Sequence, residues 1–319
     1  MVVGKTFAEV YQSLARTILD YGDEVAPRGM KTKELVQETF CIEDPTMNLS
    51  YITHRKFSLM HAIAESLLLV VKEERLACYT LMNPTMARFS DNGETLHGAY
   101  GYRIADRIQD CVEKLRNDHD TRQAVLTIHR VADVYDKSKD IPCTIALQFT
   151  IRHGHLNMHV YMRSNDIVWG TPYDVFVFTN LQMIMANELH IPIGKYYHTA
   201  TSLHAYEDQF ETLELIARNP GRPVGHRNKN GLYDWKCMAN IFCGIATHKF
   251  DEWHQAICLK LLDNDGSYAF AILMELAYKD HFHDGAADAF LDNGALTVQT
   301  DESKEWLYNF SKRWCKLDA

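Results

Sequence analysis

The sequence lacks the features that mark a membrane, secreted or zinc-binding protein. None of its apolar runs approaches the ~20 residues that a bilayer-spanning helix needs, and its N-terminus does not show a secretory pattern. The eight cysteines include no Cys-x-x-Cys pair, which argues against a zinc site or a small disulfide framework. We therefore expect a cytoplasmic protein without membrane contact, whose cysteines are mostly buried and inert.

Clusters of basic residues are also absent. The formal net charge is −9, which disfavours nonspecific binding to the phosphates of duplex nucleic acid. Sixteen histidines are present, but close pairs such as His153 and His155 have no obvious carboxylate partner along the chain. We predict no nucleic-acid partner and no metal site, and any nucleotide that the protein binds should be a free one.

The composition is that of a globular protein with a sizeable core. The chain has 319 residues, of which 46% are hydrophobic. Apolar residues at helical spacing predict helices within the first 25 residues, at 57–74 and at 175–190. Alternating patterns predict strands at 123–131, 144–152 and 155–163, the last two joined by a turn at His153-Gly154. The pattern is mixed α/β.

A break divides the chain near residue 218. The segment Arg218-Asn219-Pro220-Gly221-Arg222-Pro223 is typical of a linker. We therefore predict a catalytic domain over 1–218 and a mostly helical extension over 219–319 that packs on the same domain. Helical stretches are expected around 250–263 and 267–282, and the segment 196–206 reads as short and aromatic.

Two motifs in the middle of the chain carry reactive groups. The first is Ile141-Pro142-Cys143, and the second, twenty residues later, is Arg163-Ser164-Asn165-Asp166-Ile167-Val168-Trp169-Gly170-Thr171-Pro172-Tyr173-Asp174. A thiolate is a strong nucleophile, and a nearby guanidinium group lowers its pKa. A buried, inert cysteine is the alternative for Cys143 taken alone.

Together with Ser202-Leu203-His204-Ala205-Tyr206, these motifs resemble the active site of the thymidylate synthase family. The resemblance covers about residues 20–215. It implies an α/β (α+β) three-layer fold around a mixed β-sheet, with two subunits packed sheet against sheet as a homodimer. It also implies 5,10-methylenetetrahydrofolate as the cofactor and a pyrimidine nucleoside monophosphate as the substrate.

The resemblance assigns a role to each candidate residue. The catalytic group would be Cys143, Glu65 and Tyr100. The substrate group would be Asp174, Arg28, Arg122, Arg163, Ser164, His204 and Tyr206, and the folate side would be Asp166 and Gly170. Arg122 would reach the site of the partner subunit, although the second arginine usual at that place is Gln123 here. Glu65 lies in a predicted apolar helix, where a buried carboxylate is unfavourable unless it is paired, hydrated or used. The alternative is that Glu65 lies on the polar edge of that helix and has no catalytic role.

Asp174 is the departure from the family pattern, in which an asparagine reads uracil. An amide gives to O4 of uracil and accepts from N3–H, whereas cytosine offers a donor at N4 and an acceptor at N3. A carboxyl group accepts from N4–H and, when neutral, donates to N3. Asp174 is therefore expected to read cytosine. The alternative is that Asp174 only caps the helix formed by the apolar run that follows it.

These residues lead to a specific hypothesis of function. Addition of the Cys143 thiolate to C6 would activate C5, which would take a one-carbon unit from the folate and be hydrated to 5-hydroxymethyl-dCMP. Within the family, the motifs look most like those of phage deoxycytidylate hydroxymethylases. Open alternatives are a CMP 5-hydroxymethylase, a dCMP 5-methyltransferase and a catalytically silent relative that binds nucleotide or RNA.

Overall fold

The structure is a computed structural model that describes residues 1–81, 83–225, 235–236, 238–240, 242–243 and 247. These residues belong to one compact unit, Met1–Lys249. The main strands are β1 (Val2–Gly4), β2 (Asp23–Val25), β3 (Thr32–Ile42), β5 (Val125–Thr127), β6 (Thr144–Arg152), β7 (His155–Met162), β8 (Asn165–Asp166) and β9 (Ile193–Tyr206). The α-helices are α1 (Phe7–Tyr21), α2 (Leu59–Leu69), α3 (Leu76–Thr80), α4 (Tyr100–Asn117), α5 (Thr171–Leu189) and α6 (Phe210–Arg218).

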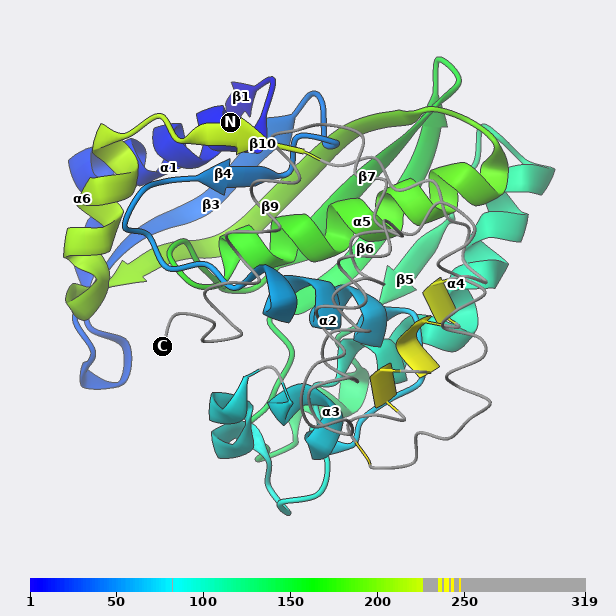
Figure 1. The fold of residues 1–319 in the computed structure, drawn as a ribbon, viewed down its shortest axis with the longest axis horizontal. Coiled ribbons are helices and arrows are strands. Elements are labelled where there is room, and N and C mark those ends of the chain that lie inside the picture. Colours follow the sequence, from blue (N-terminus) through cyan, green and yellow to red (C-terminus); the bar gives the residue numbers. More distant parts are fainter. Residues whose placement is uncertain (82, 226–234, 237, 241, 244–246, 248–319) are drawn as a thin grey trace, which may run out of the picture. The chain divides into compact units, whose positions relative to one another are not determined.

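A mixed β-sheet forms the centre of this unit, as predicted (Figure 1). Its strand order is β1-β3-β9-β7-β6-β5, with β2 added beside β3 and β8 beside β9. β9 is the hub of the sheet, because it pairs antiparallel with β3 and parallel with β7 and β8. The sheet is therefore neither purely parallel nor a simple meander.

Helix α5 crosses in front of the sheet in Figure 1 and packs on β7 and β9. Helices α2 and α4 pack on α5, while α1 packs on β1, β3 and α6. Because α5 is covered by the sheet and by other helices, it is apolar on nearly all sides, and its buried residues run from Thr171 to Ala186. The first turn of this buried helix carries Asp174.

Several local predictions are confirmed. Helix α1 begins after Thr6, whose side chain accepts a hydrogen bond from the backbone of Glu9 (3.4 Å), and it ends at Gly22. The turn between β6 and β7 has positive φ at both His153 (52°) and Gly154 (73°), as a tight two-residue hairpin requires.

Other boundaries differ from the prediction. The helix expected at 57–74 is shorter, since Ser58 caps α2 through a bond from the backbone of His61 (3.2 Å) and the helix ends at Leu69. The strand expected at 123–131 is only β5, which gives way to a 3-10 turn at Val131–Val134. The helix expected at 175–190 begins earlier, at Thr171, because Pro172 fits its first turn.

Two parts of the fold were not expected. The segment 196–206 belongs to the 14-residue strand β9, and its neighbour β3 has no counterpart among the predicted strands. The break after α6 leads into β10 (Arg222–Val224), which pairs with β4 (Leu49–Tyr51). The helical stretches predicted at 250–263 and 267–282 lie outside the described residues.

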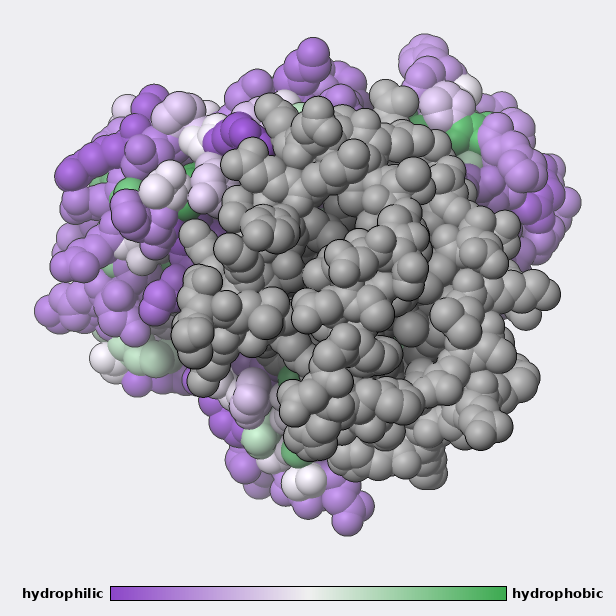
Figure 2. All heavy atoms as spheres, viewed as in Figure 1, coloured by the Kyte–Doolittle hydropathy of each residue, from purple (hydrophilic) through white to green (hydrophobic). Residues whose placement is uncertain are grey.

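The described surface has no marked apolar area in the view of Figure 2, where hydrophilic residues predominate. Within the residues that the structure describes, no helix is long and apolar enough to span a membrane.

Candidate active site

Cys143 lies where the chain enters β6, beside a β-bulge in the ladder to β7. Arg163, just after β7, holds this entry in place. Its backbone N–H donates to the carbonyl of Cys143 (2.9 Å), and its guanidinium donates to the carbonyls of Pro142 (3.0 Å) and Ile141 (2.8 Å). The predicted nucleophile and the predicted phosphate-binding arginine are therefore joined by the pairing of two neighbouring strands.

The electrostatic surroundings of Cys143 work in opposite directions. Burial raises the pKa of the Cys143 thiol, Arg163 lowers it, and Asp174 adds to the rise. Tyr100 is close by, because its hydroxyl accepts hydrogen bonds from the backbone N–H (3.2 Å) and the side chain (3.1 Å) of Thr144. Burial raises the pKa of Tyr100, and the charge of Cys143 contributes to the rise. Tyr100 therefore stays a neutral hydroxyl beside the nucleophile.

Asp174 occupies the first turn of α5, and its carboxyl group is oriented by Asn165. The amide of Asn165 donates to Oδ2 of Asp174 (2.7 Å). The oxygen of the same amide accepts from the hydroxyl of Thr171 (2.7 Å), so both ends of the Asn165 side chain are engaged. Burial, followed by the charge of Glu65, raises the pKa of Asp174 to about 8. At neutral pH this carboxyl is therefore largely protonated and offers one donor and one acceptor.

Glu65 lies on α2, which packs against α5. Its side chain keeps 31% of its surface exposed. Burial of the remainder raises the pKa of Glu65 to about 7. The charge interaction with Asp174 shows that the two predicted acids lie near one another.

The pairing of β8 with β9 brings the two downstream motifs together. Asp166 on β8 is the register partner of His204 on β9. The His204 ring contacts the Tyr206 ring edge to face (5.1 Å between centroids). Burial raises the pKa of Tyr206, Asp166 and Cys143 add to the rise, and Arg28 opposes it. The predicted sugar-binding pair thus lies within the electrostatic range of both the nucleophile and Arg28.

Arg28 reaches this place from a strained turn. It lies in the 3-10 segment η1 (Pro27–Gly29) with φ of 55°, and Gly29 follows with φ of 80°. The turn leads into β3, whose first residue, Thr32, is the register partner of Tyr206. Ser164, next to Arg163, is half-buried between β7 and β8.

Asp166 and Gly170 shape the turn before α5. Oδ1 of Asp166 accepts from the backbones of Val168 (2.7 Å) and Trp169 (3.0 Å), and Oδ2 accepts from Gln209 (2.8 Å). The carbonyl of Gly170 accepts the backbone N–H of Asp174 (3.0 Å). In the free chain both residues therefore fix the position of Asp174.

Arg122 is the one candidate that this chain does not bring to the site. It is exposed just before β5, where its carbonyl accepts from the side chain of Gln148 (2.9 Å). Its guanidinium makes no hydrogen bond or ion pair with another side chain in the described part of the chain. This position agrees with a role toward a second subunit.

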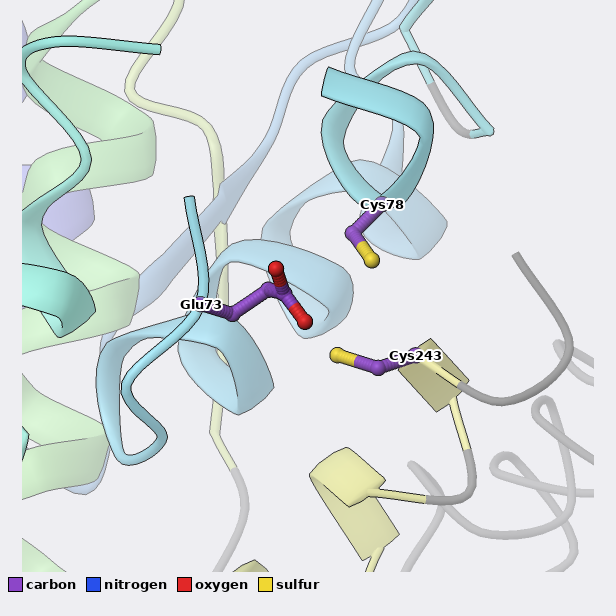
Figure 3. Close-up of side chains that lie close together, drawn as sticks. All are labelled: Glu73, Cys78 and Cys243. Carbon is purple, nitrogen blue, oxygen red and sulfur yellow. The ribbon is translucent and has the colours of Figure 1, made fainter. Parts of the chain in front are cut away.

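A separate buried group lies away from this site. The side chains of Glu73, Cys78 and Cys243 point toward one another, with their ligand-type atoms within 4.8 Å (Figure 3). The carboxylate of Glu73 already accepts from the Arg75 guanidinium (2.5 to 3.0 Å) and from the backbones of Glu74 and Arg75 (3.0 and 2.8 Å). The thiol of Cys243 also hydrogen-bonds to Glu73, so groups of the chain itself occupy this carboxylate. The spacing of the cysteines gave no sign of this group.

Sequence reasoning missed three residues of the site. Asn165 orients Asp174, His61 contacts Glu65 (Nε2 to Oε1, 3.4 Å), and Tyr173 packs on the His61 ring (5.0 Å between centroids). The spacing of His61 and Glu65, one helical turn apart in a predicted helix, is the signal that could have revealed their contact.

Comparison with known proteins agrees with this geometry. Residues 9–237 match the thymidylate synthase family. Because this match covers more than half of the sequence, the chain belongs to the thymidylate synthase family.

Similar proteins include three phage enzymes, each named a deoxyuridylate hydroxymethyltransferase. The chain is 30% identical to that of Bacillus phage SP01 over 225 residues, which is 65% of this chain and 59% of the relative. It is 31% identical to that of Pseudomonas phage M6 over 243 residues, with 70% and 69% covered. It is 28% identical to that of Delftia phage PhiW-14 over 229 residues, with 65% and 63% covered. The matched region thus spans about two thirds or less of the length of these relatives.

Proposed function

We propose that this protein is a folate-dependent pyrimidine nucleotide 5-hydroxymethyltransferase that acts on dCMP. The observation that carries the choice of cytosine is the carboxyl group of Asp174, held in place by Asn165. The relatives named for dUMP make dUMP the second candidate substrate.

The hydrogen-bonding capacity of Asp174 supports cytosine. In the neutral state its O–H donates to N3 and its other oxygen accepts from N4–H. With the same proton moved onto N3, an ionised Asp174 accepts from N4–H and from N3–H. Cytosine is therefore matched while Asp174 and N3 share one proton, and N3 of cytosine is a more basic acceptor than O4 of uracil.

Uracil is matched in only one of these states. A neutral carboxyl donates to O4 and accepts from N3–H, as an amide does. Once ionised, the carboxylate would face the lone pairs of O4, and a buried polar mismatch of this kind costs about 1–3 kcal/mol. Since the pKa of Asp174 is about 8, loss of this proton should lower activity on both nucleotides as the pH rises through that value, and the preference for dCMP should come from the stronger hydrogen bond to its basic N3.

The chemistry begins with Cys143. Its thiolate adds to C6 of the base, and the charge of Arg163 supports that thiolate. Bound methylenetetrahydrofolate supplies the one-carbon unit to the activated C5. Partly exposed Glu65 lies beside the base-reading Asp174 and holds the water that adds to the exocyclic carbon. The names of the relatives support this hydration, because each is called a hydroxymethyltransferase.

Binding of the nucleotide would use the remaining candidates. Arg163 and Ser164, with Arg28 across the site, would hold the 5′-phosphate, while His204 and Tyr206 would hold the sugar. Asp166 and Gly170 would line the folate side. If the protein hydroxymethylates CMP or methylates dCMP instead, the proposed substrate or product changes. Cys143 would still be the nucleophile in either case.

A homodimer packed through the open sheet face, which is the face opposite α5, would place Arg122 of one subunit in the site of the other. On that face, Tyr161 (39% exposed) and Ile145 (40% exposed) lie beside the stacked rings of His159 and Tyr197 (4.8 Å). Apolar and aromatic side chains of this kind are typical of subunit interfaces.

The direct test is to compare kcat/KM for dCMP, dUMP and CMP with methylenetetrahydrofolate between pH 6 and pH 9, identifying products by mass spectrometry. We expect dCMP to be preferred across this range, with activity falling above about pH 8 as Asp174 ionises. Preference for dUMP at every pH would transfer the assignment to the second candidate.

A further inference from the structure

The contacts around His61 define its protonation. The orientation of the Asn83 side chain is fixed, because its Oδ1 accepts from the backbone N–H (3.2 Å) and the hydroxyl (2.5 Å) of Thr85. Its Nδ2 therefore faces Nε2 of His61 (3.4 Å) as a donor. Nε2 of His61 must then be an acceptor, which places the ring proton on Nδ1.

This arrangement has a consequence for Glu65. Oε1 of Glu65 lies 3.4 Å from the same Nε2 of His61. Two acceptors do not attract one another, so the contact is favourable only if Oε1 carries a proton. Asn83 makes the hydrogen bond to Nε2, whereas the Glu65 contact is not aligned as a hydrogen bond in the free chain, which is common for catalytic contacts before substrate binds.

The other groups around this pair favour the neutral state. Burial raises the pKa of Glu65 to about 7, and ionisation of Glu65 and of the nearby Asp174 on α5 at the same time is unfavourable. The ring of Tyr173, also on α5, packs on His61, while its hydroxyl accepts from the backbone of Ser58 (3.0 Å). Burial lowers the pKa of His61 to about 4, so the ring is uncharged at neutral pH.

We propose that His61 is a positioning residue that keeps a proton on Oε1 of Glu65 in the resting enzyme, so that Glu65 acts first as an acid and then as a base. The inference rests on the proposed function. When the carbon–nitrogen bond to the folate breaks, the C5 proton leaves to solvent, its electron pair forms the exocyclic double bond, and Glu65 gives its proton to the departing amine nitrogen. When water adds, its oxygen bonds to the exocyclic carbon, its proton returns to Glu65, and the ring electron pair expels the Cys143 thiolate. Each turnover leaves Glu65 protonated again.

The test is a ¹³C NMR titration of the Glu65 carboxyl in the substrate-free protein, with the resonance assigned by its loss in Glu65→Gln. Wild type should titrate at about pH 7. His61→Leu removes the acceptor that favours the protonated acid, so the midpoint should fall by about one unit. His61→Gln, which retains an acceptor oxygen, should restore it. His159→Leu, which alters a half-buried histidine on the open sheet face, is the control and should leave it unchanged.

The sign of the shift decides the outcome. If His61 were a charged partner of an ionised Glu65, its removal would raise the midpoint, and an upward or absent shift in His61→Leu would overturn the proposal. Turnover then provides a second readout, because the fall of kcat with rising pH should move to lower pH in His61→Leu and return in His61→Gln. Since the titration needs no substrate, it stands even if dCMP proves not to be the substrate.

Discussion

The protonation and orientation of Asp174 depend on its neighbours as well as on its own chemistry. A carboxyl in place of an amide predicts cytosine from the sequence alone, but its protonation depends on burial and on Glu65, which lies more than 100 positions earlier. Its orientation depends on Asn165 and, behind it, Thr171. The proposed reading of the base by Asp174 therefore depends on this arrangement.

Replacing Asp174 by Asn should lower kcat/KM for dCMP by about tenfold or more, since one buried mismatch costs about 1–3 kcal/mol. Activity on dUMP should rise, because the amide gives the donor and acceptor that uracil needs at every pH. Steady-state kinetics on both nucleotides check this. An unchanged preference would reduce Asp174 to a helix cap.

The stability of the protein should also report on Asp174. Its pKa in the folded state, about 8, lies above the ordinary value of 3.8, so the folded state binds this proton more tightly. The free energy of unfolding should therefore fall as the pH rises from about 4 to 8. Asn cannot ionise, so the Tm of Asp174→Asn relative to wild type should increase from pH 5 to pH 8. Asp110→Asn, at an exposed position of α4, should show no such trend.

At the scale of elements, sequence patterns predicted what local residues determine. The existence of α1 and the turn at His153-Gly154 were readable, because helical periodicity and tight turns depend on nearby residues. The length of β9 and the existence of β3 were not. Their ladder joins residues more than 150 positions apart, and β3 mixes charged with apolar residues. Long-range pairing, which leaves little local signal, decided both strands.

The packing of α4 on α2 should control the place of Tyr100. Gly101, the next residue, has no room for a side chain, because a Cβ there would overlap the carbonyl oxygens of Leu68 and Val71. Gly101→Ala should therefore push the helices apart, lower the free energy of unfolding by about 1–3 kcal/mol and reduce turnover. Thermal unfolding and kcat measure both effects. Asp110→Ala, on the exposed side of α4, is the matched control, and equal behaviour of the two variants would contradict this role of Gly101.

At the scale of the whole molecule, the motifs predicted which residues meet but not what supports them. Cys143, Arg163, Asp174 and Tyr206 converge as expected. The supporting contacts of Asn165 and His61 come from sheet pairing and from the packing of α2 on α5, which the sequence does not display. Shared use of a site by two subunits is likewise a property of the assembly.

The dimer prediction can be tested by complementation. Arg122→Ala and Cys143→Ala subunits should each be inactive or strongly impaired alone. After subunit exchange, a mixed dimer would contain one site with both an intact Cys143 and an intact Arg122, so partial activity should return, up to about a quarter of the wild-type rate if subunits mix at random. Exchange is verified with differently tagged subunits. No recovery after verified exchange would place Arg122 outside the active site.

The central claim is that water attacks a one-carbon unit on a cytosine nucleotide. The most direct measurement is to incubate the protein with dCMP and methylenetetrahydrofolate in ¹⁸O-labelled water, with Cys143→Ala as the inactive control, and to determine the mass of the nucleotide and the oxidation state of the folate. The account predicts 5-hydroxymethyl-dCMP with one heavy oxygen in the new group and one equivalent of tetrahydrofolate. A methylated product without labelled oxygen, formed with one equivalent of dihydrofolate, would contradict it.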